Sequence, residues 1–405
     1  MDHENFDPTG MAASMTPQTP TKQRVQFLDL LRGWSVIVMI QTHVFNSTLR
    51  LDILATPFFD YIRFIDGLVA PSFLFASGMA YAVTTRRKAA QYLSFGRPLL
   101  RQMTRLLFIL LIGYGLHLPK FNYYHLRYEA GAQAWGVFWQ VDVLQCIAMS
   151  LILLQVLLLI LRSERLLYAV ATAVTIAVVA VTPFMWTIDF FTMLPVPLAE
   201  YLNGLHRSLF PLFPWLAFLF AGAVTGYRFQ LAREAAAAQT GGDPLLRITR
   251  ETAVAGVAMI ALSFVLNAIP GSASGPNDPW GLSPAFFLLR LGLVLLICAG
   301  MAWWETARTV SPASAVCLIG RESFLVYATH LILLFGRFGG APFVDRINRS
   351  FGYPEAITTT LVLFGLMYAL AYAWERVKSS PVLLKRSVQG LILAGFLLVF
   401  FFGPN

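Results

Sequence analysis

The chain has 405 residues, of which 57% are hydrophobic and only 13% are charged, and its formal net charge is +9. About a quarter of the residues of a soluble domain are usually charged, so this composition excludes an ordinary soluble enzyme and indicates a polytopic membrane protein. The positive charge lies near the ends of apolar segments and forms no basic domain with interleaved aromatic residues. This distribution argues against nucleic-acid binding.

The first 23 residues, MDHENFDPTGMAASMTPQTPTKQ, are polar and rich in Pro, Thr and small residues. They lack the basic start and apolar core of a cleaved signal peptide. We therefore expect a disordered cytoplasmic tail at 1–23 and a single transmembrane domain over 24–405. The cysteines Cys146, Cys298 and Cys317 lie in apolar runs without the spacing of a metal site, which predicts that they pack in the core.

Eleven apolar stretches are candidates for membrane spans, because about 20 mostly apolar residues cross roughly 30 Å of hydrocarbon. Two of the stretches are short, so ten or twelve spans remain open. The predicted fold class is an all-α, polytopic bundle of about 11 transmembrane helices (10–12), and no internal repeat is visible. The stretches are 26–46, 64–84, 103–118, 139–161, 166–186, 209–229, 252–269, 284–304, 316–335, 356–374 and 388–402.

The basic residues predict the orientation of these spans. Cytoplasmic loops of membrane proteins carry an excess of Lys and Arg, so the N-terminus is expected inside. The histidines, apart from His3, then fall at outer ends of spans or in outer loops. The clusters that lie inside are Lys22/Arg24, Arg86/Arg87/Lys88, Arg97/Arg101/Arg105, Arg162/Arg165, Arg228/Arg233, Arg247/Arg250 and Lys385/Arg386.

The stretch RGWSVIVMIQTH, residues 32–43, places two ionisable groups inside the first predicted span. Arg32 and His43 are eleven positions apart, which is three helical turns plus about 20°, so they share one face about 16.5 Å apart along the axis. Because charged groups are costly in hydrocarbon, this face should point into the bundle or a wet cavity. Asp29, one turn earlier, is placed to pair with Arg32. Alternatively, Arg32 snorkels to the inner surface and His43 lies at the outer interface.

The segment GRESFLVYATH carries a second polar stripe. Ser323, Tyr327 and His330 follow at spacings of four and three, so they share one helical face. They either orient His43, bind an acceptor or donate to a developing oxyanion, or they form ordinary interhelical hydrogen bonds.

Other polar residues lie near the outer surface. Asp66 and Asp142 lie near the starts of two predicted spans. Each either binds the hydroxyls of an acceptor or holds the histidine, or is simply a hydrated end of its span. His117, His125 and His206 show neither an i, i+4 pair nor an HExxH motif, so no metal site is predicted.

The segment FLDLLRGWSVIVMIQTHVF contains an arginine and a histidine separated by ten residues. This pair resembles the hallmark of transmembrane acyltransferases, in particular the bacterial relatives of heparan-α-glucosaminide N-acetyltransferase. Five further segments are similar to spans of that family in the same order. They are FIDGLVAPSFLFASGMAYA, RQMTRLLFILLIGYGLHL, VDVLQCIAMSLIL, FPLFPWLAFLFAGAVTGY and GRESFLVYATHLILL.

The resemblance implies an enzyme of a bacterial-type inner (plasma) membrane that moves an acyl group, most simply acetyl, from cytosolic acyl-CoA to a sugar hydroxyl or amine at the outer face. The lysosomal enzyme has an asparagine where His43 stands and carries its histidine on the following stretch. Residues 47–65 here contain no histidine, and Cys146 replaces a common arginine. The catalytic role therefore falls on His43.

Acyl transfer from a thioester requires a base for the incoming nucleophile, and an imidazole suits this task at neutral pH. His43 acts either as that base or as an acyl carrier. Arg32, Arg101 and Arg105 are candidates for the CoA phosphates, although Arg101 and Arg105 fit ordinary inner flanking charges equally well. No metal is expected, and the oligomeric state stays open.

The alternative function is a secondary transporter or flippase of a glycan or lipid-linked substrate. Such proteins also have about eleven spans, and transporters often contain repeats with broken helices. The absence of a visible repeat and the scarcity of acidic residues at span centres argue against it.

Overall fold

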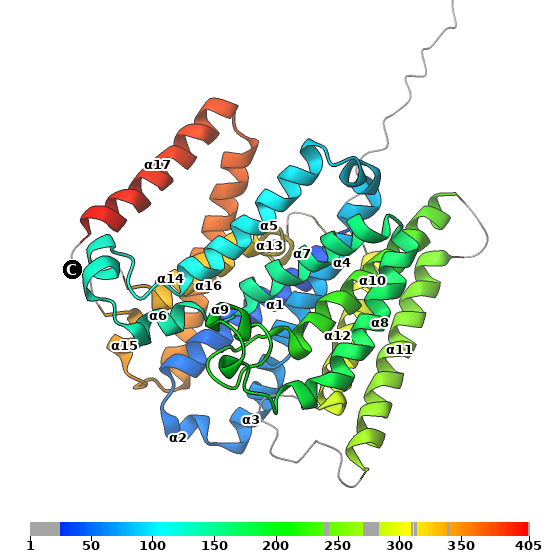
Figure 1. The fold of residues 1–405 in the computed structure, drawn as a ribbon, viewed down its shortest axis with the longest axis horizontal. Coiled ribbons are helices and arrows are strands. Elements are labelled where there is room, and N and C mark those ends of the chain that lie inside the picture. Colours follow the sequence, from blue (N-terminus) through cyan, green and yellow to red (C-terminus); the bar gives the residue numbers. More distant parts are fainter. Residues whose placement is uncertain are drawn as a thin grey trace, which may run out of the picture.

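The computed structural model describes residues 25–238, 243–269, 283–308, 311, 314–337 and 341–403. Within these ranges the chain is helical, and extended pairing is limited to one isolated bridge between Leu49 and Phe351. The predicted all-α bundle is confirmed (Figure 1). The predicted tail at 1–23 lies outside the described residues.

Each of the eleven predicted spans coincides with a helix or a pair of helices. The long helices are α1 (Gln26–Thr48), α4 (Val69–Leu93), α5 (Arg97–Leu116), α7 (Val143–Leu161), α8 (Glu164–Met185), α10 (Leu212–Ala237), α11 (Pro244–Asn267), α12 (Pro284–Ala307), α16 (Tyr353–Ser379) and α17 (Val382–Phe402). The shorter ones are α2 (Leu51–Leu54), α3 (Pro57–Asp66), α6 (Ala132–Phe138), α9 (Val196–Ala199), α13 (Ala315–Arg321), α14 (Ser323–Phe335), α15 (Phe343–Ile347), the π-helical turn η1 (His125–Glu129) and the 3-10 turn η2 (Phe190–Thr192).

Length and composition identify nine membrane-crossing helices in the described part of the chain, or ten if α13 and α14 form one span. In that set α3 and α4 count as a single helix from Pro57 to Leu93. The helix α1 is not among them, although its 23 residues are enough to cross. Its polar residues lower its hydropathy, and with α1 included the number reaches the predicted eleven.

One prediction about these spans is wrong. The stretch 316–335 is not one continuous helix, because α13 and α14 are bent by 87° at Glu322. Two ion pairs hold this break to the last turns of α16: Arg321 Nη2 lies 2.6 Å from Glu375 Oε1, and Lys378 pairs with Glu322. In the sequence the polar residues Arg321, Glu322 and Ser323 interrupt the apolar run at this point.

Ion pairs show which helix ends share one face of the bundle. Arg86 near the end of α4 pairs with Glu234 near the end of α10 at 2.8 Å. Arg233, the residue before Glu234 in α10, pairs with Glu305 near the end of α12 at 3.0 Å. Glu305 also accepts the backbone N–H of Phe27 at the start of α1 at 2.7 Å. We call this face the inner side.

The opposite helix ends are tied together in the same way. The backbone N–H of Arg50 after α1 donates to the carbonyl of Phe351 before α16 at 3.0 Å. Trp186 Nε1 after α8 donates to the carbonyl of Phe213 in the first turn of α10 at 3.0 Å. This outer side carries α2, α3 and α15, which lie at the other end of the bundle from the α4–α5 and α16–α17 connections (Figure 1). The long helices thus run between these two sides of the bundle.

The helix α1 lies inside the bundle, where it contacts α4, α12, α13, α14 and α16. Its contact with α13 is backbone to backbone. A Cβ on Gly33 would lie 2.1 Å from the carbonyl oxygen of Val316, and a Cβ on Gly320 would lie 1.9 Å from that of Asp29. Small residues allow such close approach of membrane helices. The side chains of α1 are therefore held in fixed positions.

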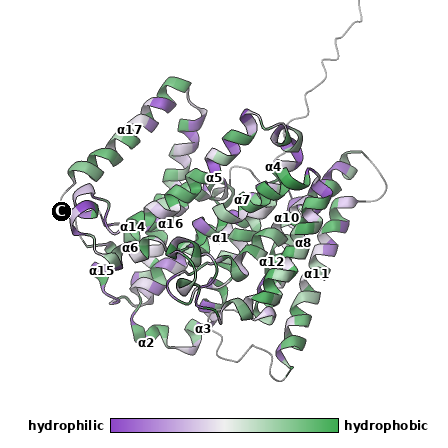
Figure 2. Cartoon of the chain, viewed as in Figure 1, coloured by the Kyte–Doolittle hydropathy of each residue, from purple (hydrophilic) through white to green (hydrophobic). Residues whose placement is uncertain are grey.

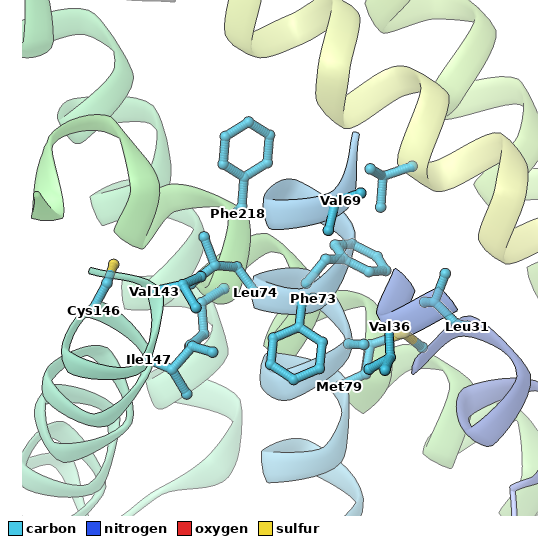
Figure 3. Close-up of a cluster of buried hydrophobic side chains, with 14 of the residues drawn as sticks. Leu31, Val36, Val69, Phe73, Leu74, Met79, Val143, Cys146, Ile147 and Phe218 are labelled. Atoms are coloured by element: carbon cyan, nitrogen blue, oxygen red, sulfur yellow. The ribbon is translucent and has the colours of Figure 1, made fainter. Parts of the chain in front are cut away.

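Buried apolar side chains surround α1. Figure 3 shows Leu31 and Val36 of α1 beside Phe73 and Met79 of α4, with residues of α7 on the far side of α4. Cys146 of α7 is fully buried, and all three cysteines are free and buried, as predicted.

Apolar residues also dominate the outside of the bundle, as Figure 2 shows for the peripheral helices. The helix α17 has no buried residue at all, and its exposed side chains include Leu391, Leu393 and Phe402. In water such a surface would be unfavourable, whereas hydrocarbon solvates it. The protein is therefore a multi-pass membrane protein.

Candidate active site

Two histidines from distant parts of the chain meet near the outer side of the bundle. His43 Nδ1 lies 2.9 Å from His330 Nε2, and the two rings stack with centroids 5.1 Å apart. His330 is fully buried, while His43 is half-buried. The predicted polar faces of α1 and α14 thus converge on one histidine pair.

The hydrogen-bond partners fix the protons of this pair when both rings are neutral. His330 Nδ1 lies 2.9 Å from the carbonyl oxygen of Val326, which can only accept, so this nitrogen carries the proton. His330 Nε2 is then an acceptor, and His43 Nδ1 must be the donor between the rings. The tautomers are inferred from these partners. His43 Nε2 is left with its lone pair, as a base requires.

A cavity of about 330 Å³ lies on the inner side of the histidine pair. Its walls come from α1, α4, α5, α7, α13 and α14, and along α4 they extend from Thr84 to Phe73, about 16 Å of helix. Volumes of this size are typical of small-molecule sites. Arg32 lines this cavity, and so does Ser323.

Three arginines gather around the inner part of the cavity. Arg32 and Arg105 are the predicted members, and Arg321 from the end of α13 joins them. Arg321 is held by Glu375, with 11% of its side chain exposed. Arg101 is exposed on the second turn of α5 and does not line the cavity. Guanidinium groups in this arrangement suit an anionic ligand such as a phosphate.

Two aromatic rings separate the cavity from the histidine pair. Phe73 lines the cavity and stacks on Tyr327, with ring centroids 6.1 Å apart. Tyr327 in turn meets His330 edge to face at 5.7 Å. His43 is not part of the cavity lining. Phe73 and Tyr327 thus connect the cavity lining to the histidine pair through ring contacts.

Asp29 lies on the buried side of α1, one turn before Arg32, with 5% of its surface exposed. Its backbone carbonyl lies against Gly320 at the contact of α1 with α13. This position puts Asp29 at the inner part of the bundle, at the level of the cationic cavity.

Asp142 lies at the outer side, where it caps α7. Its Oδ1 accepts the backbone N–H of Val143 at 2.6 Å, and its Oδ2 lies 3.5 Å from His117 Nε2. Asp142 is therefore fixed at the start of α7, close to His117.

Asp66 lies at the end of α3 with 8% of its surface exposed, and its carboxylate faces the side chains of Gln41 and Thr42 on α1. Neither of its oxygens accepts a well-formed hydrogen bond within the described residues. Asp66 therefore occupies a buried polar position beside α1 on the outer side.

The remaining outer histidines lie in loops with local partners. His125 Nδ1 is 2.7 Å from Glu129, and His206 Nε2 is 2.8 Å from Asp189. The hydrogen bond from His206 holds the pKa of Asp189 below its ordinary value. Among the residues with described positions, no group of three or more His, Cys, Asp or Glu side chains is arranged to hold a metal ion.

Sequence reasoning missed three residues of this region. Arg321 lies inside the predicted span 316–335, two residues before Ser323, and the sequence alone does not show that it faces the cavity. His117 and Gln145 meet only across α5 and α7, with Gln145 Nε2 3.1 Å from His117 Nδ1. Their spacing in sequence carries no signal for this contact.

Comparison with protein-family models adds an independent observation. Residues 24–267 match the model of heparan-alpha-glucosaminide N-acetyltransferase, catalytic, which is more than half of the chain. The matched range includes Arg32, His43 and Asp142, and it ends before Arg321 and His330. A comparison with curated proteins finds no match.

Proposed function

Because the chain belongs to the heparan-α-glucosaminide N-acetyltransferase family, we propose that it transfers an acyl group, most simply acetyl, from acyl-CoA on the inner side to a sugar hydroxyl or amine on the outer side. The observation that supports this most is that α1 carries Arg32 in a cationic cavity and His43 in a histidine pair. The membrane is a bacterial-type inner membrane, with the start of α1 in the cytosol.

The donor occupies the cationic cavity in this proposal. Its volume of about 330 Å³ suits the slender pantetheine arm, and the larger nucleotide stays at the inner mouth. Arg32, Arg105 and Arg321 neutralise the phosphates through charge-assisted hydrogen bonds. Arg101, exposed one turn nearer the surface than Arg105, contacts the nucleotide end from outside the cavity.

The arm reaches the histidine pair when the rings of Phe73 and Tyr327 move apart. Phe73 lines the cavity and stacks on Tyr327, and Tyr327 contacts His330. Their displacement places the thioester carbonyl near His43 Nε2, the ring atom that the hydrogen bonds leave free.

The chemical step exchanges one bond to the acyl carbon for another. The acceptor oxygen or nitrogen attacks the thioester carbonyl carbon, and its proton passes to His43 Nε2. The C–S bond then breaks, and His43 returns the proton to the leaving thiolate, giving free CoA and the acylated acceptor. A route through an acyl-histidine uses the same atom, with Nε2 bonding to the acyl carbon before the acceptor does.

His330 orients the base rather than touching the substrate. Its Nδ1–H is held by Val326 and its Nε2 accepts from His43, so His43 cannot present its other nitrogen. The tautomer of a catalytic histidine is commonly fixed by such a partner. The acceptor is a carbohydrate in this proposal, because the family model is named for a glucosaminide substrate.

The test is acyl transfer by the purified protein in lipid nanodiscs. Labelled acetyl-CoA is supplied with an amino-sugar acceptor, and both thiol release and labelled product are measured. We expect both in the natural protein and a loss of about 10²–10⁴-fold in His43→Gln, since general-base catalysis contributes about that factor.

Equal rates in the two proteins would contradict the role of His43. Movement of a glycan or lipid-linked substrate across the membrane without thiol release would contradict the enzyme and support a transporter instead.

A further inference from the structure

The cavity arginine Arg321 has a charged partner on α16. Arg321 is the last residue of α13 and lines the cationic cavity, and its Nη2 lies 2.6 Å from Glu375 Oε1 in the last turns of α16. The side chain of Arg321 is 11% exposed, whereas that of Glu375 is 43% exposed. The bundle therefore encloses the guanidinium, and a carboxylate nearer the surface holds it.

A second ion pair holds the backbone that carries Arg321. Lys378, three residues after Glu375 on α16, pairs with Glu322, the residue at the break between α13 and α14. Residues three apart lie on one face of a helix, so α16 places a carboxylate and an ammonium group against the opposite charges of Arg321 and Glu322. A shift of α16 by one turn would break both pairs.

The backbone beside Arg321 is also fixed against α1. A Cβ on Gly320, the preceding residue, would lie 1.9 Å from the carbonyl oxygen of Asp29. Arg32, one turn after Asp29, lines the same cavity as Arg321. Like charges that share a cavity repel each other, and the carboxylate of Glu375 offsets part of this repulsion.

A held guanidinium binds an anion better than a loose one. The long side chain of arginine is flexible, and ordering such a side chain on binding weakens the affinity by about two- to tenfold. A guanidinium is planar and carries its N–H groups in fixed directions, so a bond to Glu375 at Nη2 sets the plane of the whole group. The ion pair therefore orders Arg321 before a ligand binds.

We propose that Glu375 is a positioning residue for the donor, which holds the guanidinium of Arg321 in the cavity wall before the CoA phosphates bind. The inference rests on the proposed function, in which Arg321 contacts those phosphates. Glu375 itself does not line the cavity, so it acts through Arg321 and not on the ligand.

The decisive measurement is the Kd of free CoA for the protein in lipid nanodiscs, by titration calorimetry, because binding requires no turnover. Glu375→Ala removes the partner of Arg321 and places a good helix former on α16. We expect the Kd and the donor KM to rise about two- to tenfold, with kcat unchanged within about twofold. Glu375→Gln keeps an acceptor oxygen and should recover part of the affinity.

The matched control is Glu251→Ala. Glu251 on α11 pairs with Arg228 at 2.7 Å and is 44% exposed, so it resembles Glu375 in distance and exposure. Neither residue of this control pair lines the cavity. Glu251→Ala should bind CoA with the Kd of the natural protein.

A double-mutant cycle tests whether Glu375 acts through Arg321. In Arg321→Gln, the further change Glu375→Ala should not raise the Kd for CoA, because the side chain that Glu375 holds is gone. A purely structural tie between α13 and α16 would add the same loss in both backgrounds and contradict the inference. If Glu375→Ala does not fold, the same cycle is measured with Glu375→Gln.

The outcomes separate this inference from the function beneath it. Equal Kd values for CoA in the natural protein and in Glu375→Ala would overturn the positioning role and leave the proposed function intact. A lower Kd in Glu375→Ala would overturn it as well, because the carboxylate would then compete with the phosphates. If the natural protein does not bind CoA, the proposed function and this inference both fail.

Discussion

At the scale of single residues, His43 differs from the other outer histidines in the partners of its ring. His125 and His206 each face a carboxylate in a loop, whereas His43 faces His330, whose other nitrogen is bound to a backbone carbonyl. This arrangement leaves one nitrogen of His43 free and makes His43 the residue best suited to proton transfer.

Changing His330 tests whether it orients His43. His330→Gln should lower kcat by about tenfold, because one hydrogen bond contributes about 0.5–1.5 kcal/mol. The loss should be clearly smaller than that in His43→Gln. The measurement is steady-state transfer, with His206→Gln as a matched control in an outer loop. An equal loss in both site variants would mean that His330 is itself a reacting group.

The arginines of the cavity predict a change in donor affinity. Arg321→Gln and Arg32→Gln should each raise the donor KM about 10- to 100-fold, because a hydrogen bond to a charged group contributes about 1.5–3 kcal/mol. Arg101→Gln should raise it about fivefold at most, since exposed ion pairs contribute about 0–1 kcal/mol.

The control for these variants is Arg228→Gln, which removes an exposed inner arginine paired with Glu251 at 2.7 Å. Unchanged donor KM values in both Arg32→Gln and Arg321→Gln would exclude the cavity as the donor site.

Part of the candidate site could be predicted from the sequence, because helical geometry alone places Arg32 and His43 on one face. The stripe of Ser323, Tyr327 and His330 followed from the same rule. The contacts of Arg321 and His117 could not be predicted, since they depend on which helices pack together.

At the scale of helices, the position of α1 depends on its contact with α13. Gly33 and Gly320 remove the side chains that would hold the two backbones apart. The sequence predicted the helices on both sides of this contact. It did not predict the break at Glu322, which is stabilised by pairing with Lys378 on a different helix.

Gly33→Ala should therefore destabilise the protein. The new Cβ would lie 2.1 Å from the carbonyl oxygen of Val316, and inserted methyl groups in a tight core typically cost about 1–3 kcal/mol. Thermal unfolding in detergent measures the change. The control is Gly300→Ala in α12, where nothing lies within 4 Å of the new Cβ. If the two variants unfold at the same temperature, the close contact of α1 with α13 contributes nothing to stability.

At the scale of the whole molecule, the two candidate subsites lie at different depths of one bundle. The cationic cavity is lined by Arg32 and Arg105 near the inner ends of α1 and α5. The histidine pair lies nearer the outer ends of α1 and α14. The all-α fold class and the multi-pass character followed from composition and apolar length. The way the helices enclose a cavity did not, because packing order is not encoded in hydropathy.

The central claim is that donor and acceptor react from opposite sides of the membrane. The direct measurement uses sealed vesicles of both orientations, with membrane-impermeant labelled acetyl-CoA outside and an amino-sugar acceptor either inside or outside. The account predicts labelled acceptor in the lumen only when the inner side faces the medium, and none in His43→Gln. Labelling of an acceptor on the same side as the donor, or equal transfer in both orientations, would contradict it.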